Sequence, residues 1–428
     1  MRSILEDSFR AAVAAADPLK VLPAELPPPP RGRTFVAAAG KAAASMALAV
    51  ETHWPADAPL DGLALTRYAH GLPTSRIRVV EGGHPVPDEA GERAAREILA
   101  AARALREEDL LLVLVSGGGS ALLTLPAEGI SMADMKAVTK DLLRCGADIR
   151  EMNTVRKHLS AIQGGRLAAA TQARVLALVV SDVTGDDPTH IASGPCAPDP
   201  STYAEAREIL ARYRIASPAA IRARLDAGVR GEAEETPKPG DALFARVENR
   251  VVASAHRSLE AAAEAFRARG IQPVILGDSI TGEARDVAKV MAALVREIRA
   301  YGAPFKPPVA LISGGECTVT VRGGKGRGGR CSEFLLALAV ELGGLPGVHA
   351  MAADTDGIDG SEDNAGAVVA PDSLDRARRA GIDAARLLAD NDSYAFFAAL
   401  GDLVVTGPTR TNVNDYRSIL IAPSAGGS

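Results

Sequence analysis

"DLLLVLVSGGGSALLTLP" spans Asp109–Pro126 and indicates the class of fold. Its first part holds six apolar residues in a row, Leu110 to Val115. Such an uninterrupted run is typical of a strand buried on both faces of a parallel sheet. Three glycines follow, and they predict a tight turn before a helix or turn that begins at Ser120.

Two further segments repeat this design. "RTFVAAAGKAAASMALAVE" (33–51) predicts a strand, a turn at Gly40 and a helix from Lys41. "ARVLALVVSDVTGDDPTHIASGP" (173–195) predicts a buried strand that ends at Ser181, with a polar loop after it. Strands that alternate with helices in this way predict an α/β fold with a parallel sheet, whose ligands bind beyond the carboxyl ends of the strands.

A change of composition marks residues 231–244, "GEAEETPKPGDALF", which are charged and contain two prolines. This segment is typical of a linker, and a second series of strands and helices follows it. One strand of that series, "CTVTVRGG" at 317–324, alternates polar and apolar residues and is expected to be half exposed. A chain of 428 residues exceeds one compact core. We therefore expect two domains, 1–235 and 243–428.

Charge and composition exclude several classes of protein. The net charge of −5 argues against general binding of nucleic acid, and no apolar run approaches the ~20 residues of a membrane span. The four cysteines show no CxxC spacing, so a zinc site or redox motif is not expected. Isolated cysteines suit a reducing compartment, and we expect a cytoplasmic protein.

A basic, glycine-rich segment, "TVTVRGGKGRGGRCSEFLLALAV", lies at 318–340. Its first part carries four positive charges, at Arg322, Lys325, Arg327 and Arg330. Glycines let backbone N–H groups approach a ligand, and the N-terminus of the following helix, whose N-cap is expected at Ser332, favours an anion. The segment therefore predicts a loop that holds the phosphates of a nucleotide, with Arg330 gripping phosphate oxygens in bidentate fashion.

The same loop permits another interpretation. Gly324, Gly326 and Gly329 satisfy GxGxxG after a predicted strand, and Asp354 follows at the distance of a ribose-binding acid. This pattern is typical of a nicotinamide-cofactor domain. The basic residues inside it fit a triphosphate better than a buried pyrophosphate, and both interpretations stay open at this point.

Other polar groups fall at strand ends or on helices. Lys41 opens a helix, where its charge is reasonable if an anion lies there too. "SGGGS" at 116–120 is a second turn rich in backbone N–H groups. Arg156 lies in a polar helical run with Asn153 that is suited to a small carboxylate. The lone histidines His84 and His158 are expected to be structural.

Two acidic loops and one neutral polar loop complete the candidates. "SDVTGDDP" and "DTDGIDGSED" follow predicted strands, and such carboxylates suit Mg²⁺, which also takes phosphate oxygens and water. "TGPTRTNVNDY" at 406–416 offers neutral donors for a nucleotide or polar substrate. The side chains concerned are Asp182, Asp186, Asp187, Asp354, Asp356, Asp359, Thr409, Asn412 and Asn414.

Eight motifs in order resemble the glycerate 2-kinases of the MOFRL type: "AAGKAAASMA", "GGHPVPDEAG", "LVSGGGSALL", "NTVRKHLSAIQGGRLA", "SDVTGDDPTHIASGP", "SGGECTVTVRGGKGRGGR", "DTDGIDGSEDNAGA" and "GPTRTNVNDYRSILI". The resemblance implies a Rossmann-like N-terminal domain, a C-terminal MOFRL domain and an active site in the cleft between them. It also implies ATP- and Mg²⁺-dependent phosphorylation of D-glycerate to 2-phosphoglycerate.

The resemblance implies roles for particular residues. Lys41 corresponds to the family's functional lysine and Arg330 to its functional arginine, and Asp182 or Asp187, Asp356 and Asn414 fall in the other motifs that line the family's cleft. From the chemistry of phosphoryl transfer, Asp182 or Asp187 is expected to orient or deprotonate the substrate hydroxyl. Asp182 and Asp356 are the expected metal ligands. Where relatives often carry an amide-bearing pair, this chain has Cys331 and Ser332. The expected substrate- and nucleotide-binding residues are Ser116, Gly117, Gly118, Gly119, Ser120, Arg156, Glu316, Lys325, Gly326, Gly328, Gly329, Asp356, Thr409, Asn412 and Asn414.

Two alternatives to the kinase remain at this stage. The first is an NAD(P)H-dependent hydroxypyruvate reductase, a name that similar sequences have carried and that GxGxxG keeps open. The second is a nucleotide-binding sensor without turnover. A homodimer is compatible with the sequence, which does not determine the oligomeric state.

Overall fold

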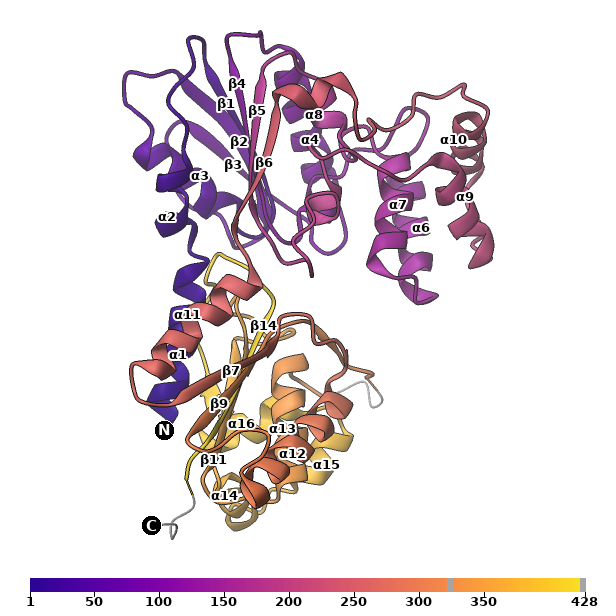
Figure 1. Cartoon of the computed structure of the whole chain (residues 1–428). Helices are drawn as coiled ribbons and strands as arrows, with labels where there is room; N and C mark the ends of the chain where they lie inside the picture. Colours follow the sequence, from indigo (N-terminus) through magenta and orange to yellow (C-terminus); the bar gives the residue numbers. More distant parts are fainter. Residues whose placement is uncertain (322–325, 424–428) are drawn as a thin grey trace. The chain divides into compact units, whose positions relative to one another are not determined.

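The computed structural model describes residues 1–321 and 326–423, and its chain divides into two compact units. The first unit is Pro18–Val252, and the second is Met1–Asp17 together with Ala253–Ser428 (Figure 1). Both units are layered α/β structures. The predicted α/β class with two domains is confirmed. Among the described residues, no helix is both long and apolar enough to cross a membrane.

The first unit contains a six-stranded sheet in the order β3-β2-β1-β4-β5-β6. Its neighbouring pairs from β3 to β5 are parallel, as the continuous apolar runs predict. The strands are β1 Thr34–Ala39, β2 Leu60–Arg67, β3 Ile77–Gly82, β4 Leu110–Val115, β5 Arg174–Val180 and β6 Val247–Ala253. The helices are α2 Pro18–Val21, α3 Ala43–His53, α4 Glu89–Arg103, α5 Gly119–Leu122 and α8 Arg166–Ala169.

Four more helices of the first unit form a lobe beside the sheet (Figure 1). They share a separate apolar core, to which Met135, Val155, Tyr203 and Leu225 contribute. Polar N-caps set where three of them begin, because the side chains of Ser131, Asp148 and Thr202 accept backbone N–H groups of the first turn. The helices are α6 Met132–Arg144, α7 Ile149–Leu159, α9 Tyr203–Arg212 and α10 Ala219–Val229.

The sheet of the second unit is mixed, in the order β13-β12-β11-β14-β9-β7. Only the β7–β9 pair is parallel among its described pairs. The strands are β7 Gln272–Gly277, β9 Val309–Ser313, β11 Val348–Asp354, β12 Gly366–Val369, β13 Leu403–Val404 and β14 Asp415–Ile421, and a separate two-stranded ladder joins β8 Gly282–Glu283 to β10 Cys317–Thr318.

Helices cover both faces of this second sheet. In β9, Val309 and Leu311 pack in a core with α12 and α13, whereas Ala310 and Ile312 pack in another with α1 and α11, which is the period of two expected of a strand. The helices are α1 Arg2–Ala15, α11 Ala255–Arg267, α12 Ala284–Tyr301, α13 Arg330–Leu342, α14 Ser373–Arg379, α15 Ala384–Ala389 and α16 Ser393–Leu400.

Helix α1 lies beside α11 in the second unit (Figure 1). Leu5 and Phe9 join a core with Phe266 and Tyr416, and the Ser8 and Tyr416 hydroxyls are 2.7 Å apart. The first unit is therefore inserted in the chain between two helices of the second.

Three local expectations differ from the structure. The first domain was expected to end at 235 and the second to begin at 243, but segment 231–244 lies inside the first unit. The reason is that β6, which follows this segment, adds an edge strand to the first sheet. The expected strand 317–324 is ordered as a strand only at Cys317–Thr318, and residues 322–325 lie outside the described part. Helix α13 begins at Arg330 with Gly329 as N-cap, so the predicted N-cap, Ser332, is wrong.

Candidate functional site

In the first unit, the turns after β1 and β4 lie at the point where the strand order reverses. From β1 the chain proceeds to β2 and β3 on one side, and β4 then lies on the other side of β1. Ala39 and Val115, the last residues of β1 and β4, are register partners. Crevices of this kind are the usual ligand sites of open parallel sheets.

Hydrogen bonds join the Lys41 turn to the glycine loop. Lys41 N donates to Gly117 O at 2.8 Å, and Ala42 N donates to Ser116 Oγ at 3.0 Å. A side chain on Gly40 would collide with Ser116, and its φ of +129° also favours glycine. These contacts place Lys41 two residues before α3, which begins at Ala43 rather than at Lys41 as predicted.

The glycine loop also brings His84 to this turn. Gly118 has φ +80°, and a Cβ there would lie 2.8 Å from His84 Nε2 and 3.4 Å from Lys41 Cγ. The imidazole and the lysine side chain therefore both border Gly118. His84 had been expected to be structural, and the only sequence signal for it was its motif "GGHPVPDEAG".

Ser120 and Arg156 belong to one polar cluster. Ser193 Oγ donates to Ser120 Oγ at 2.9 Å and lies 3.1 Å from Asn153 Oδ1. Arg156 Nη1 lies 3.5 Å from the same Asn153 oxygen, and Arg156 and Ser120 line one narrow pocket with Gln163. Burial lowers the pKa of Arg156 below its ordinary value. The structure thus brings together two predicted substrate residues that lie far apart in sequence.

Ser193 was missed because its signal is conformational. Ala192 and Ser193 have φ of +50° and +58°, a left-handed conformation that costs a non-glycine residue free energy and that clusters at functional sites. Ala192 packs so closely on Gly119 that a Cβ on the glycine would lie 2.6 Å from the alanine Cβ. No sequence pattern predicts that two consecutive non-glycine residues adopt this left-handed conformation.

Asp182 and Asp187 lie in the loop after β5. Asp182 is half-buried, and the side chain of Asp187 is 50% exposed. Burial raises the pKa of Asp187, but hydrogen bonds from Thr189 and the charge of His190 outweigh it, so the pKa is lowered and the group is a carboxylate at neutral pH. The loop is tied to the polar cluster because Asn153 Nδ2 donates to His190 O at 3.2 Å.

In the second unit, Arg330 is surrounded by carboxylates. Its Nε donates to Asp415 Oδ1 at 2.6 Å and its Nη2 to Asp354 Oδ2 at 2.7 Å. Its Nη1 lies 3.2 Å from Glu316 Oε1. Burial lowers the pKa of Arg330, but Asp415 and Asp354 outweigh it and hold the pKa above its ordinary value. Glu316 and Arg330 were predicted together, whereas Asp415 was missed.

The N-terminus of α13 is occupied by a side chain of the protein. The two carboxylate oxygens of Asp359 accept Cys331 N at 2.9 Å and Ser332 N at 2.8 Å. The expectation that this helix end presents its N–H groups to a phosphate is therefore wrong for these two amides. Arg330 remains the cationic group at this position.

The described glycines of the basic loop pack against protein. A Cβ would collide with Asp390 and Asn391 at Gly326, with Ser393 at Gly328, and with Asp359 at Gly329. Close packing is thus one reason for these glycines, and Gly324 and Lys325 lie outside the described residues.

Asp356, Thr409 and Asn414 meet around one backbone segment. Thr409 N donates to Asp356 O at 3.0 Å, and Thr355 N donates to Asn414 O at 3.2 Å. Asn412 is also buried in this loop. Asp356 is 3% exposed, and its Oδ1 accepts Ile358 N at 2.9 Å. The structure thus brings these four predicted residues into one loop pair of the second unit.

The carboxylates predicted as metal ligands differ in how well they are placed to bind a cation. Within residues 1–321 and 326–423, no group of three or more His, Cys, Asp or Glu side chains is arranged to hold a metal ion. Mg²⁺ commonly uses only one or two carboxylates with phosphate oxygens and water. The partly exposed Asp182 and Asp187 fit that role better than Asp356, whose carboxylate is buried.

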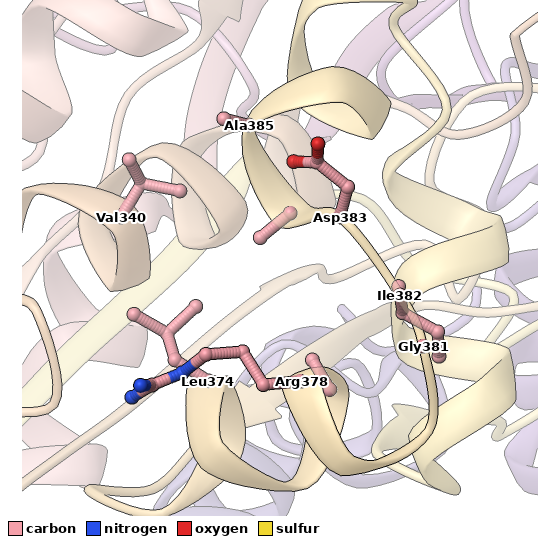
Figure 2. Close-up of a pocket in the computed structure, with 9 residues that line it drawn as sticks. Val340, Leu374, Arg378, Gly381, Ile382, Asp383 and Ala385 are labelled. Atoms are coloured by element: carbon pink, nitrogen blue, oxygen red, sulfur yellow. The ribbon is translucent and has the colours of Figure 1, made fainter.

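A pocket of about 450 Å³ lies elsewhere in the second unit, among residues of α13, α14 and α15 (Figure 2). Val340, Leu374 and Ile382 line it, and Arg378 and Asp383 are its charged residues. It contains none of the predicted site residues and is not part of the candidate site.

Comparisons with known proteins identify related families, relatives and structures. A domain of unknown function, DUF4147, matches residues 4–226, and the MOFRL family matches 309–415. A putative hydroxypyruvate reductase of Agrobacterium vitis is 52% identical over 98% of this chain and 94% of its own. The glycerate 2-kinase of Pyrococcus horikoshii is 42% identical over 92% of this chain and 87% of its own. The crystal structure of glycerate kinase from Thermotoga maritima has a TM-score of 0.87 and 36% identity, covering 98% of this chain and 99% of that one.

Proposed function

The chain belongs to the MOFRL-type glycerate kinase family, and we propose that it transfers the terminal phosphoryl group of ATP to D-glycerate, forming 2-phosphoglycerate and ADP. The observation that carries the proposed mechanism is the joining of Lys41 to the glycine loop at the β1/β4 crevice. Phosphoryl transfer depends on positioning and on neutralising charge rather than on covalent chemistry. A lysine held beside a glycine loop supplies both the positioning and the positive charge.

In this mechanism Lys41 neutralises the transferring phosphoryl group, whose charge is spread over its oxygens in the transition state. His84, which like Lys41 borders Gly118, is the proposed hydrogen-bond donor to the same group. Fixed donors of this kind need no reorganisation during reaction.

The polar cluster around Ser120 is the proposed carboxylate site for glycerate. Arg156 supplies a half-buried positive charge, and Ser120 and Ser193 supply hydroxyl donors. Asp187 or Asp182 accepts the proton of the substrate hydroxyl. The lowered pKa of Asp187 keeps its carboxylate ionised at neutral pH, and it also makes Asp187 a weaker base than an ordinary aspartate.

Mg²⁺ is the proposed metal. Whichever of Asp182 and Asp187 does not accept the proton would hold it together with the phosphates, and it would neutralise phosphate charge when bound. Arg330 is the proposed phosphate-binding cation of the second unit. That both units act on one phosphoryl group stays a prediction, as do the binding roles of Asp356, Thr409, Asn412 and Asn414. A cytoplasmic location, a homodimer and the absence of nucleic-acid partners also stay predictions.

The reductase alternative is not favoured, although two relatives carry that name. A dinucleotide fingerprint needs a strand and helix of one parallel βαβ unit. Here β10, which precedes the loop, pairs only with β8 among the described strands, and β11, which follows α13, is antiparallel to both of its neighbours. Asp354, the expected ribose ligand, is buried against Arg330.

A coupled assay tests the proposed function. We expect ADP release that requires D-glycerate and Mg²⁺, and NMR of the product should show the phosphate on the 2-hydroxyl. Oxidation of NADH with hydroxypyruvate, without glycerate-dependent ADP release, would support the reductase instead. ATP binding without either reaction would support a sensor.

A further inference from the structure

The three carboxylates around Arg330 differ in burial. The side chains of Asp415 and Asp354 are 0% and 3% exposed, whereas that of Glu316 is 56% exposed. Arg330 itself is 23% exposed. Two edges of the guanidinium are thus held inside the second unit, and the edge at Nη1 reaches the surface beside Glu316.

The buried contacts orient the guanidinium. Asp415 also accepts from Arg417 Nη1 at 3.3 Å, and Asp354 Oδ1 accepts Asp356 N at 3.0 Å. Separating a charge from a buried partner is costly, so an incoming anion does not displace these two carboxylates. Asp415 and Asp354 are therefore positioning residues that aim Nη1 outward.

Glu316 is held differently. Its backbone is fixed on both sides, because Asp415 N donates to Gly315 O at 3.1 Å and Cys317 pairs with Gly282 in the β10–β8 ladder. Its side chain is exposed, and exposed ion pairs contribute little free energy. An anion that approaches Nη1 can therefore displace this carboxylate at small cost and without moving the backbone.

We propose that Glu316 is a displaceable counter-ion of Arg330, which competes with phosphate groups for Nη1 and so limits how tightly the second unit binds them. The inference rests on the proposed function, because it takes a phosphate group as the competing ligand. It reverses the simpler expectation that Glu316 assists nucleotide binding. Removing a carboxylate that assists binding, for example through the metal, would weaken phosphate binding, whereas removing a competing carboxylate would strengthen it.

Titration calorimetry of the full chain with inorganic phosphate at low ionic strength tests this directly. We expect Glu316→Gln to lower the dissociation constant of phosphate about fivefold, the effect of losing one exposed ion-pair competitor. The KM for ATP should fall by a similar factor. Glu264→Gln is the matched control, because Glu264 is also an exposed glutamate paired with an arginine, Arg267, but lies on α11. It should change neither value.

The proposal would be overturned if Glu316→Gln bound phosphate as weakly as the wild type or more weakly. It would also be overturned if neither protein bound phosphate measurably. Thermal unfolding of each variant verifies that the fold is retained. Because calorimetry needs no turnover, a protein that fails the glycerate assay but binds phosphate more tightly as Glu316→Gln would refute the proposed function and leave this inference standing.

Discussion

Replacing Gly118 with alanine tests the crevice between β1 and β4. At φ +80°, alanine is in the left-handed region, which costs about 1 kcal/mol. The new Cβ would also lie 2.8 Å from His84 Nε2 and 3.0 Å from Cδ2. Because the imidazole must move, overpacking adds about 1–3 kcal/mol, so we expect the free energy of unfolding to fall by about 2–4 kcal/mol.

Gly129→Ala is the matched control. Gly129 has φ +82°, and apart from its chain neighbours no atom of the described residues lies within 4 Å of its would-be Cβ, so only the backbone cost of about 1 kcal/mol applies. Urea unfolding measures both variants. In the ADP-release assay, kcat/KM should fall at least ~10-fold for Gly118→Ala and stay unchanged for Gly129→Ala. Equal stability and equal activity of the two variants would show that the contact of Gly118 with His84 and Lys41 does not organise the site.

Three further predictions rest on Lys41 and on contacts of Arg330 and Glu235. Lys41→Met should lower kcat at least ~100-fold with a circular dichroism spectrum like that of the wild type; retained turnover would exclude Lys41 from the chemistry. Arg330→Ala should lower the free energy of unfolding in urea by about 3 kcal/mol, because it removes the guanidinium from two buried carboxylates, whereas Arg330→Lys should lose activity with a smaller effect on stability. Burial raises the pKa of Glu235, but hydrogen bonds from His158 and backbone groups outweigh it and lower the pKa from 4.5 to about 2. The contribution of Glu235 to stability is therefore present above pH 4.5 and lost as pH falls toward 2. The Tm of Glu235→Gln should thus depend less on pH in that window than the Tm of the wild type, and an equal pH dependence of the two Tm values would contradict this.

The strands of the first sheet were predictable because their signal is local. Uninterrupted apolar runs mark β4 and β5, and the structure buries both. The start of α3 was less predictable, since Lys41 is held in the preceding turn by Ser116 and Gly117, about 75 residues away. A helix boundary that depends on a contact with distant residues cannot be predicted from the sequence around it.

The surroundings of Arg330 were predictable only in part. The arginine stood out because of its basic, glycine-rich loop, but Asp415 begins a strand 85 residues later and carries no motif that pairs it with Arg330. The cap of α13 was misplaced for a similar reason, because Asp359 supplies the N-terminal contacts from a different loop. Likewise, β6 looks like the first strand of a new domain until its pairing with the earlier sheet is known.

The insertion of one unit inside the other has a consequence for synthesis on the ribosome. Helix α1 emerges before the first unit, but its apolar residues Leu5 and Phe9 pack against Phe266 and Tyr416, which are translated far later. The nascent helix must therefore wait while Pro18–Val252 is made, and that unit can complete its own core in the meantime. Slow translation should favour the correct order of assembly, and a fragment that starts at Ala253 should expose the surface on which α1 normally lies.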